Sequence, residues 1–133
     1  MKSLFIGLLF LSQLSFANDC NTDFRNGATD LNFGETTFNF AIDQYNNAVE
    51  ESESDSPSIQ LICDYLHSSG ANFQVASERF QFCGASFLAA MSSCQGEDVI
   101  IASRYKNTCL KNKETAFANG HHLQNLYDQT CRK

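Results

Sequence analysis

The stretch from Phe73 to Cys94 carries the pattern that most restricts how this chain can fold. Apolar residues recur through it at alternating intervals of three and four residues. This spacing places them along one side of an α-helix, as a narrow seam that packs against neighbouring helices. The seam consists of Phe73, Ala76, Phe80, Cys83, Phe87, Ala90 and Cys94. It predicts a core helix, which is a simpler use of these residues than a cofactor-binding stripe.

Helical spacing also marks the segments before this one. A first helix is expected at about residues 35–51, although its opening at residues 36–40 can be read instead as a short strand. A second helix is expected to begin at Ser56-Pro57, where serine can cap the helix and proline fits its first turn. Ser69-Gly70 is expected to end it, because glycine is common just after a helix.

The helical pattern resumes at Glu97, after a turn at Gln95-Gly96, and continues to the C-terminus. A break near Asn112 would divide this stretch into two helices, although asparagine and lysine interrupt helices only mildly. Strand-like alternation is rare in the chain, and proline occurs once. The sequence therefore predicts an all-α fold, a small disulfide-stapled bundle of four or five helices.

Residues 1–17 have the features of a cleavable signal peptide. Lys2 provides a short positive region, residues 4–11 an apolar core, and Ser15-Phe16-Ala17 the small residues of a cleavage site. The apolar run is too short to cross a bilayer, which takes about 20 residues. We therefore expect residues 18–133 to form one secreted domain, extracellular or, in a bacterium, periplasmic.

Two further features restrict the partners of this domain. Asp19 stands directly before Cys20, where attachment of a lipid would need a small residue, so we expect no membrane anchor. The chain is acidic, with a formal net charge of −6 at pH 7. Such a charge disfavours phosphate backbones and anionic lipid headgroups. We therefore expect no nucleic-acid partner.

All the cysteines follow the predicted leader, and their even number in an exported chain predicts a disulfide framework. They are Cys20, Cys63, Cys83, Cys94, Cys109 and Cys131. Cys83 and Cys94 lie on one predicted helix, about 16 Å apart along its axis. A disulfide needs Cα atoms within about 7 Å, so these two cannot bond to each other.

Two chain reversals would then decide the pairing. A reversal at Gly96 makes Cys83 and Cys109 symmetric about the turn, and a second one near Asn112 would bring the last cysteine back beside Cys94. A single unbroken helix over residues 97–131 would contradict this scheme. The predicted pairs are Cys83–Cys109, Cys94–Cys131 and Cys20–Cys63.

The candidate catalytic and metal-binding residues are few. Asp64 and His67 are three residues apart on the expected second helix, where they could orient an imidazole for base chemistry or, with a third ligand, bind a metal. A surface hydrogen bond is the simpler role for them. His121 and His122 are the other metal candidates, but adjacent helical residues project about 100° apart and do not converge on one ion. We expect no cofactor.

The weakness of these motifs and a core with many phenylalanines favour a non-enzymatic binding or interaction protein. An apolar pocket between helices would be its ligand site, although a solid core is the simpler use of the aromatic residues. The partner would be a small apolar ligand or an unidentified protein. One alternative is a secreted effector or inhibitor that acts on another protein through the acidic residues 50–55 of an exposed loop. Another is a small hydrolase or metal-dependent enzyme using His67 and Asp64.

Overall fold

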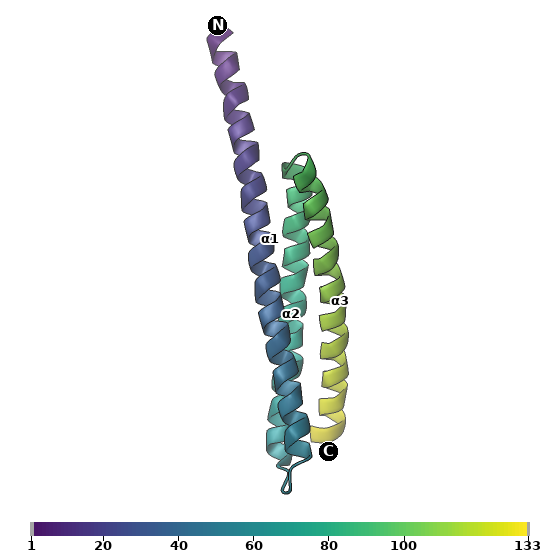
Figure 1. Ribbon diagram of the computed structural model, residues 1–133. Helices are drawn as coiled ribbons and strands as arrows, with labels where there is room; N and C mark the ends of the chain where they lie inside the picture. The colour runs from purple at the N-terminus through teal and green to yellow at the C-terminus, as the bar shows by residue number, and fades with distance from the viewer. Residues whose placement is uncertain (1, 133) are drawn as a thin grey trace.

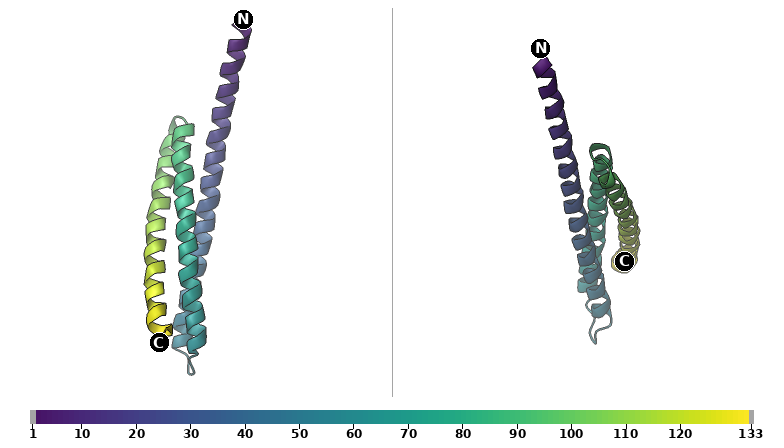
Figure 2. Two further views of the ribbon diagram at one scale, coloured as in Figure 1. Left: turned by 180° about the vertical axis from the view of Figure 1, so that it is seen from behind. Right: turned by 45° about the horizontal axis from the view of Figure 1, so that its top comes forward.

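A computed structural model describes residues 2–132 of the chain, with the side chains of residues 19–132. Three long helices make up the regular structure of this part: α1 (Lys2–Ser52), α2 (Ile59–Ser93) and α3 (Glu97–Cys131). Consecutive helices run antiparallel, and α2 lies between the other two (Figures 1 and 2). The all-α prediction is confirmed, and the alternative of a strand at residues 36–40 is wrong, because these residues belong to α1.

The chain has three helices rather than four or five, because two predicted breaks are absent. Gly70 lies inside α2 instead of ending a helix, and a Cβ atom built on it would lie 3.7 Å from the Cβ of Leu123 in α3. Gly70 is therefore a buried position in the interface with α3, at a distance that is ordinary for van der Waals contact. Asn112 likewise lies inside α3, which continues without interruption to Cys131.

The start of α2 also differs from the prediction by two residues. Ser58, not Ser56, is the N-cap, and its hydroxyl accepts a hydrogen bond of 3.3 Å from the backbone N–H of Leu61. The backbone N–H of Ser58 donates in turn to the carboxylate of Glu51 at 2.8 Å, which ties the cap to the end of α1. The reversal predicted at Gly96 is confirmed, with φ of 62° at that glycine.

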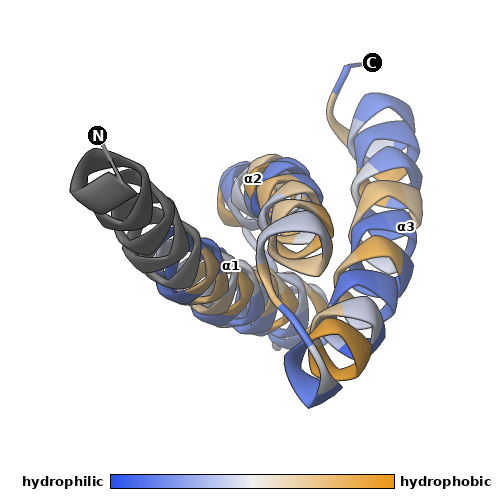
Figure 3. Ribbon diagram, turned by 90° about the horizontal axis from the view of Figure 1, so that it is seen from above, coloured by the Kyte–Doolittle hydropathy of each residue, from blue (hydrophilic) through white to orange (hydrophobic). Residues whose placement is uncertain are grey.

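The predicted seam of α2 is buried along its whole length, with every member between 0% and 7% exposed. The helix uses it to pack against both neighbours, whereas α1 and α3 contact each other at few points. Seen from above, α1 and α3 lie on different sides of α2 (Figure 3). The fold is therefore organised around one central helix.

The interface between α1 and α2 repeats every seven residues, with small residues of α1 against large residues of α2. A Cβ atom built on Gly27 would lie 2.7 Å from the ring of Phe87, and one on Gly34 would lie 2.7 Å from the ring of Phe80. The same register continues down the helices, where alanines take the place of the glycines: Ala41 clusters with Phe73, and Ala48 with Leu66. Packing of this kind holds the two helices in a single register.

The interface between α2 and α3 is built from small side chains on both helices. Ala76 packs with Ala116, and Ala90 belongs to the same buried cluster as Ala102. Ser77 of α2 donates a hydrogen bond of 3.3 Å to a backbone carbonyl of α3. These small side chains allow α3 to lie close to α2 along its length.

Three disulfides join α2 and its C-cap residue Cys94 to the two outer helices. The structure pairs Cys83 with Cys109, as predicted, but the predicted pairs Cys94–Cys131 and Cys20–Cys63 are wrong. Because α3 does not reverse at Asn112, its last residue lies beside the start of α2, and the antiparallel α1 brings its first cysteine beside the end of α2. The bonds are Cys20–Cys94, Cys63–Cys131 and Cys83–Cys109.

Within the part of the chain that the structure describes, no helix combines the length and the apolar content that crossing a membrane would require.

The close approach of Gly34 to Phe80 predicts the outcome of adding one methyl group. We expect Gly34→Ala to lower the free energy of unfolding by about 1–2 kcal/mol, because overpacking outweighs the gain in helix propensity. Gly70→Ala is the matched control, since its Cβ would meet only ordinary van der Waals contacts, and it should be neutral or stabilising. Urea denaturation followed by circular dichroism measures both. Equal effects of the two substitutions would contradict the packing described.

Candidate functional site

The space between α1 and α3 forms a groove along one side of the bundle, and the rings of α2 form its floor. The groove consists of three hollows. The upper hollow, of about 300 Å³, lies at Phe87, the middle hollow, of about 340 Å³, at Phe80, and the lower hollow, of about 220 Å³, at Phe73. Each is lined by all three helices, and together they follow the helices from one end of the bundle toward the other.

The groove has the same seven-residue period as the core. Its floor residues are seven apart on α2, so equivalent positions lie about 10 Å apart along the helix axis. The wall from α1 is mainly apolar, and the wall from α3 becomes polar in the middle. The lining residues that lie seven apart are Phe24, Leu31, Phe38 and Tyr45 on α1, and Tyr105, Asn112 and Asn119 on α3.

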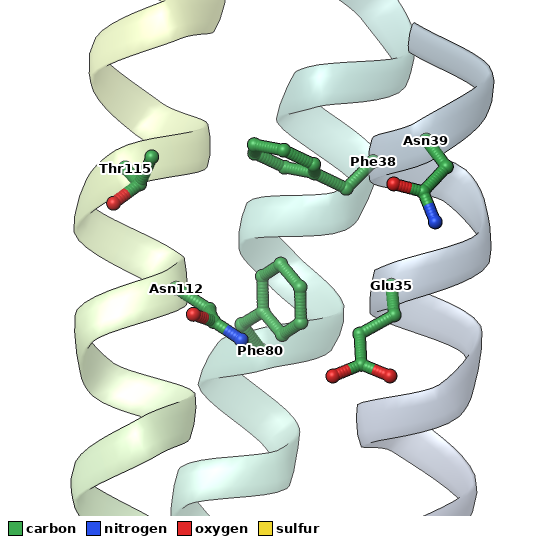
Figure 4. Close-up of a pocket in the computed structure, with 6 residues that line it drawn as sticks. All are labelled: Glu35, Phe38, Asn39, Phe80, Asn112 and Thr115. Atoms are coloured by element: carbon green, nitrogen blue, oxygen red, sulfur yellow. The ribbon is translucent and has the colours of Figure 1, made fainter. Parts of the chain in front are cut away.

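The middle hollow combines an aromatic centre with polar edges (Figure 4). The ring of Phe38 meets that of Phe73 edge to face at 5.0 Å and lies 6.4 Å from that of Phe80. Glu35 and Asn39 project from α1 on one side of these rings, and Asn112 and Thr115 of α3 lie on the other, where they complete the lining. A bound group would therefore meet aromatic carbon at the centre and hydrogen-bonding groups at the rim.

The upper hollow is aromatic on both sides of its floor. Phe87 packs edge to face against Phe24 of α1, with ring centroids 5.6 Å apart, and stacks on Tyr105 of α3 at 5.1 Å. Tyr105 remains 45% exposed, so one face of this stack is open to solvent. The lower hollow has a comparable open residue in Ile42, which is 38% exposed.

Glu35 dominates the electrostatics of the groove. It lines both the upper and the middle hollow, and no other aspartate, glutamate, lysine or arginine lines any of the three hollows. The groove therefore offers a single negative charge beside apolar surface.

No covalent bond crosses the groove within the described residues. Each disulfide connects α2, or its C-cap, to one outer helix, and all six cysteines are bonded in this way. The outer helices are thus held to α2 but not to each other. The width of the groove depends on side-chain contacts alone.

The structure does not join Asp64 and His67 into a pair. Both are exposed near the start of α2. Asp64 accepts a hydrogen bond of 3.0 Å from Gln60, and the ring of His67 lies 5.5 Å from that of Tyr127. Among the described side chains no hydrogen bond links the two residues, so the geometry expected of an oriented imidazole is not formed.

The two adjacent histidines also point to separate surroundings. His121 contacts the amide of Asn125 at 3.2 Å, and His122 lines the lower hollow. In the part of the chain with described side chains, no group of three or more histidine, cysteine, aspartate or glutamate residues is placed to hold a metal ion.

The wall of the groove on α1 was not predicted from the sequence, although the pattern that forms it is present there. Phe24, Leu31, Phe38 and Tyr45 recur every seven residues. The first helix was expected to begin near residue 35, and the first half of this pattern therefore lay outside it.

Comparison with known proteins leaves the site unassigned. No protein-family model matches the chain, and neither a curated protein nor a solved structure shows significant similarity to it.

The contacts of Phe38 predict how much the groove wall contributes to stability. We expect Phe38→Ala to lower the free energy of unfolding by about 2 kcal/mol, because it removes contacts with two buried rings. Phe40→Ala on the same helix is the control, since this ring is 48% exposed, and its effect should stay near 0.5 kcal/mol. Chemical denaturation of both variants measures the difference. A smaller decrease in the free energy of unfolding for Phe38→Ala than for Phe40→Ala would contradict the packing described.

Proposed function

We propose that this protein is a secreted, non-enzymatic binding protein that holds an apolar partner in the groove between α1 and α3. The observation that carries the proposal is the line of three solvent-open hollows floored by Phe73, Phe80 and Phe87. An apolar partner would cover the exposed parts of the walls there, such as Tyr105 and Ile42, which are 45% and 38% exposed, and each Å² of apolar area removed from water contributes about 25 cal/mol.

The form of the groove favours an elongated partner over a compact one. A small-molecule pocket encloses about 70–90% of its ligand. Here the floor rings are almost fully buried, at 1–4% exposure, so the hollows are shallow and no ligand can sink between the helices. A partner that lies along the groove can use all three hollows at once.

The covalent framework supports the same use. Because α1 and α3 are bonded to α2 and not to each other, they can separate slightly without breaking a disulfide. The core beneath the groove, where the rings of α2 rest on the glycines of α1, would remain intact during this movement. Binding would then require only local adjustment of the walls.

A role outside the cytosol is part of the proposal. Three intramolecular disulfides are typical of proteins that fold in an oxidising compartment. The signal peptide proposed at residues 1–17 would direct the chain there, and its removal would leave α1 to begin shortly before Cys20.

The alternative of an effector or inhibitor that acts on another protein is supported by one observation. Residues 53–57 between α1 and α2 are exposed and include Glu53 and Asp55, so a protein could contact this acidic loop. The loop stands at one end of the bundle (Figure 1). The hydrolase or metal-enzyme alternative at His67 and Asp64 rests on sequence spacing alone.

Binding in the groove can be tested with an uncharged apolar dye, Nile red. We expect saturable fluorescence enhancement with the wild-type protein and its loss in Asn112→Trp, because the indole would fill the middle hollow. Asn107→Trp is the matched control, since Asn107 is an exposed residue of α3 outside the groove and should leave dye binding unchanged. No saturable enhancement, or equal loss in both variants, would count against the groove as a binding site.

Expression with the native N-terminus in a secreting host tests the proposed leader. We expect the exported protein to begin at Asn18, as cleavage after Ala17 would leave it, and to contain no free thiol. N-terminal sequencing and the intact mass without reduction measure both properties. Export of a chain that still carries residues 1–17 would contradict the cleavage site.

A further inference from the structure

We infer that the occupant of the groove is an amphipathic α-helix of a partner protein, with apolar residues repeating every seven positions and a lysine or arginine beside Glu35. This inference rests on the proposed binding function and specifies the partner.

The period of the groove is the first argument. The three hollows follow Phe87, Phe80 and Phe73, so they recur at about 10 Å, the distance that separates residues seven apart on a helix. A helix laid along the groove would therefore place one apolar side chain in each hollow in turn. An alkyl chain has no such period and would gain nothing from the spacing.

The arrangement of the helices is the second argument. Each outer helix packs on α2, but α1 and α3 barely touch, so a fourth helix against both of them would complete a four-helix bundle. Tyr105 and Ile42 line the groove and are 45% and 38% exposed. A fourth helix would cover these two side chains. From Phe24 to Tyr45 the groove extends about 32 Å, the length of a helix of about 21 residues.

Charge complementarity is the third argument, and it selects a basic partner. Glu35 belongs to two of the three hollows, so a side chain that enters either one approaches its carboxylate. A partner carboxylate would be repelled there, whereas a lysine or arginine could bury its methylenes on Phe38 and bring its charge to Glu35. The net charge of −6 attracts the same kind of helix from a distance.

A pair of synthetic peptides tests the inference directly. The probe is a labelled, capped peptide of three heptads with leucine at the a and d positions and lysine at the flanking positions. The matched peptide has the same composition, but its leucines are not seven residues apart. We expect the heptad peptide to bind saturably, to gain helical content on binding, and to displace Nile red, and we expect the matched peptide to bind at least tenfold more weakly.

Variants of the protein test the position and the charge. Asn112→Trp should abolish peptide binding, and Asn107→Trp should not. Glu35→Gln should weaken binding about threefold to fivefold at low salt, as expected for loss of one partly exposed ion pair. Asp43→Asn is the control for net charge, because Asp43 is an exposed residue of α1 that lines none of the three hollows, and it should have a smaller effect.

The possible results separate this inference from the proposed function. If dodecylamine or dodecanoate displaces Nile red but neither peptide does, the groove binds ligands and the inference of a helix is wrong. Equal binding of the two peptides, or equal effects of the substitutions at residues 35 and 43, would mean general attraction to an acidic chain and would also overturn it. A wild-type dimer that Asn112→Trp converts to a monomer would show that a second copy of this chain occupies the groove, and would overturn the inference of a separate partner protein. Failure of every probe would remove the proposed function as well.

Discussion

The packing of the α2 phenylalanines on the glycines of α1 is the contact on which the rest of the structure depends. The rings of Phe80 and Phe87 occupy the space that side chains at Gly34 and Gly27 would fill. Any slip of α1 along α2 would place larger residues under these rings, so the register of the two helices is fixed. This register brings Cys20 beside Cys94, where a disulfide closes the end of the interface.

The groove is a consequence of this arrangement. Both α1 and α3 pack on the apolar seam of α2, and disulfides join each of them to α2 or its C-cap. The contact between α1 and α3 therefore contributes little to the fold. The side chains that face the groove between α1 and α3 are consequently not required to fill it. Asn112 and Asn119 occupy positions that an α1–α3 interface would make apolar, and Glu35 brings a charge to the same surface. These polar side chains therefore lie where the packing of the helices does not require apolar residues.

Much of the fold could be predicted from the residues alone. The seam from Phe73 to Cys94, the reversal at Gly96 and the all-α class all follow from periodicity and turn chemistry, which are local properties. The predicted breaks at Gly70 and Asn112 were wrong for a related reason. Gly70 has a local preference to end a helix, but it is buried in the interface between α2 and α3, and the packing of the continuous helix outweighs that preference. Nothing in its neighbouring residues distinguishes the two uses.

The spacing of apolar and small residues is enough to say which side of each helix is buried, because helix geometry converts sequence distance into direction. It cannot say which helix covers that side. The covering helix depends on whether α3 continues unbroken over its full length. The same property decides the partner of every cysteine except Cys83 and Cys109, which lie on either side of the turn at Gly96. Predicting the groove requires the same information. The groove exists because α1 and α3, which are distant in sequence, both pack on α2 but contact each other at few points.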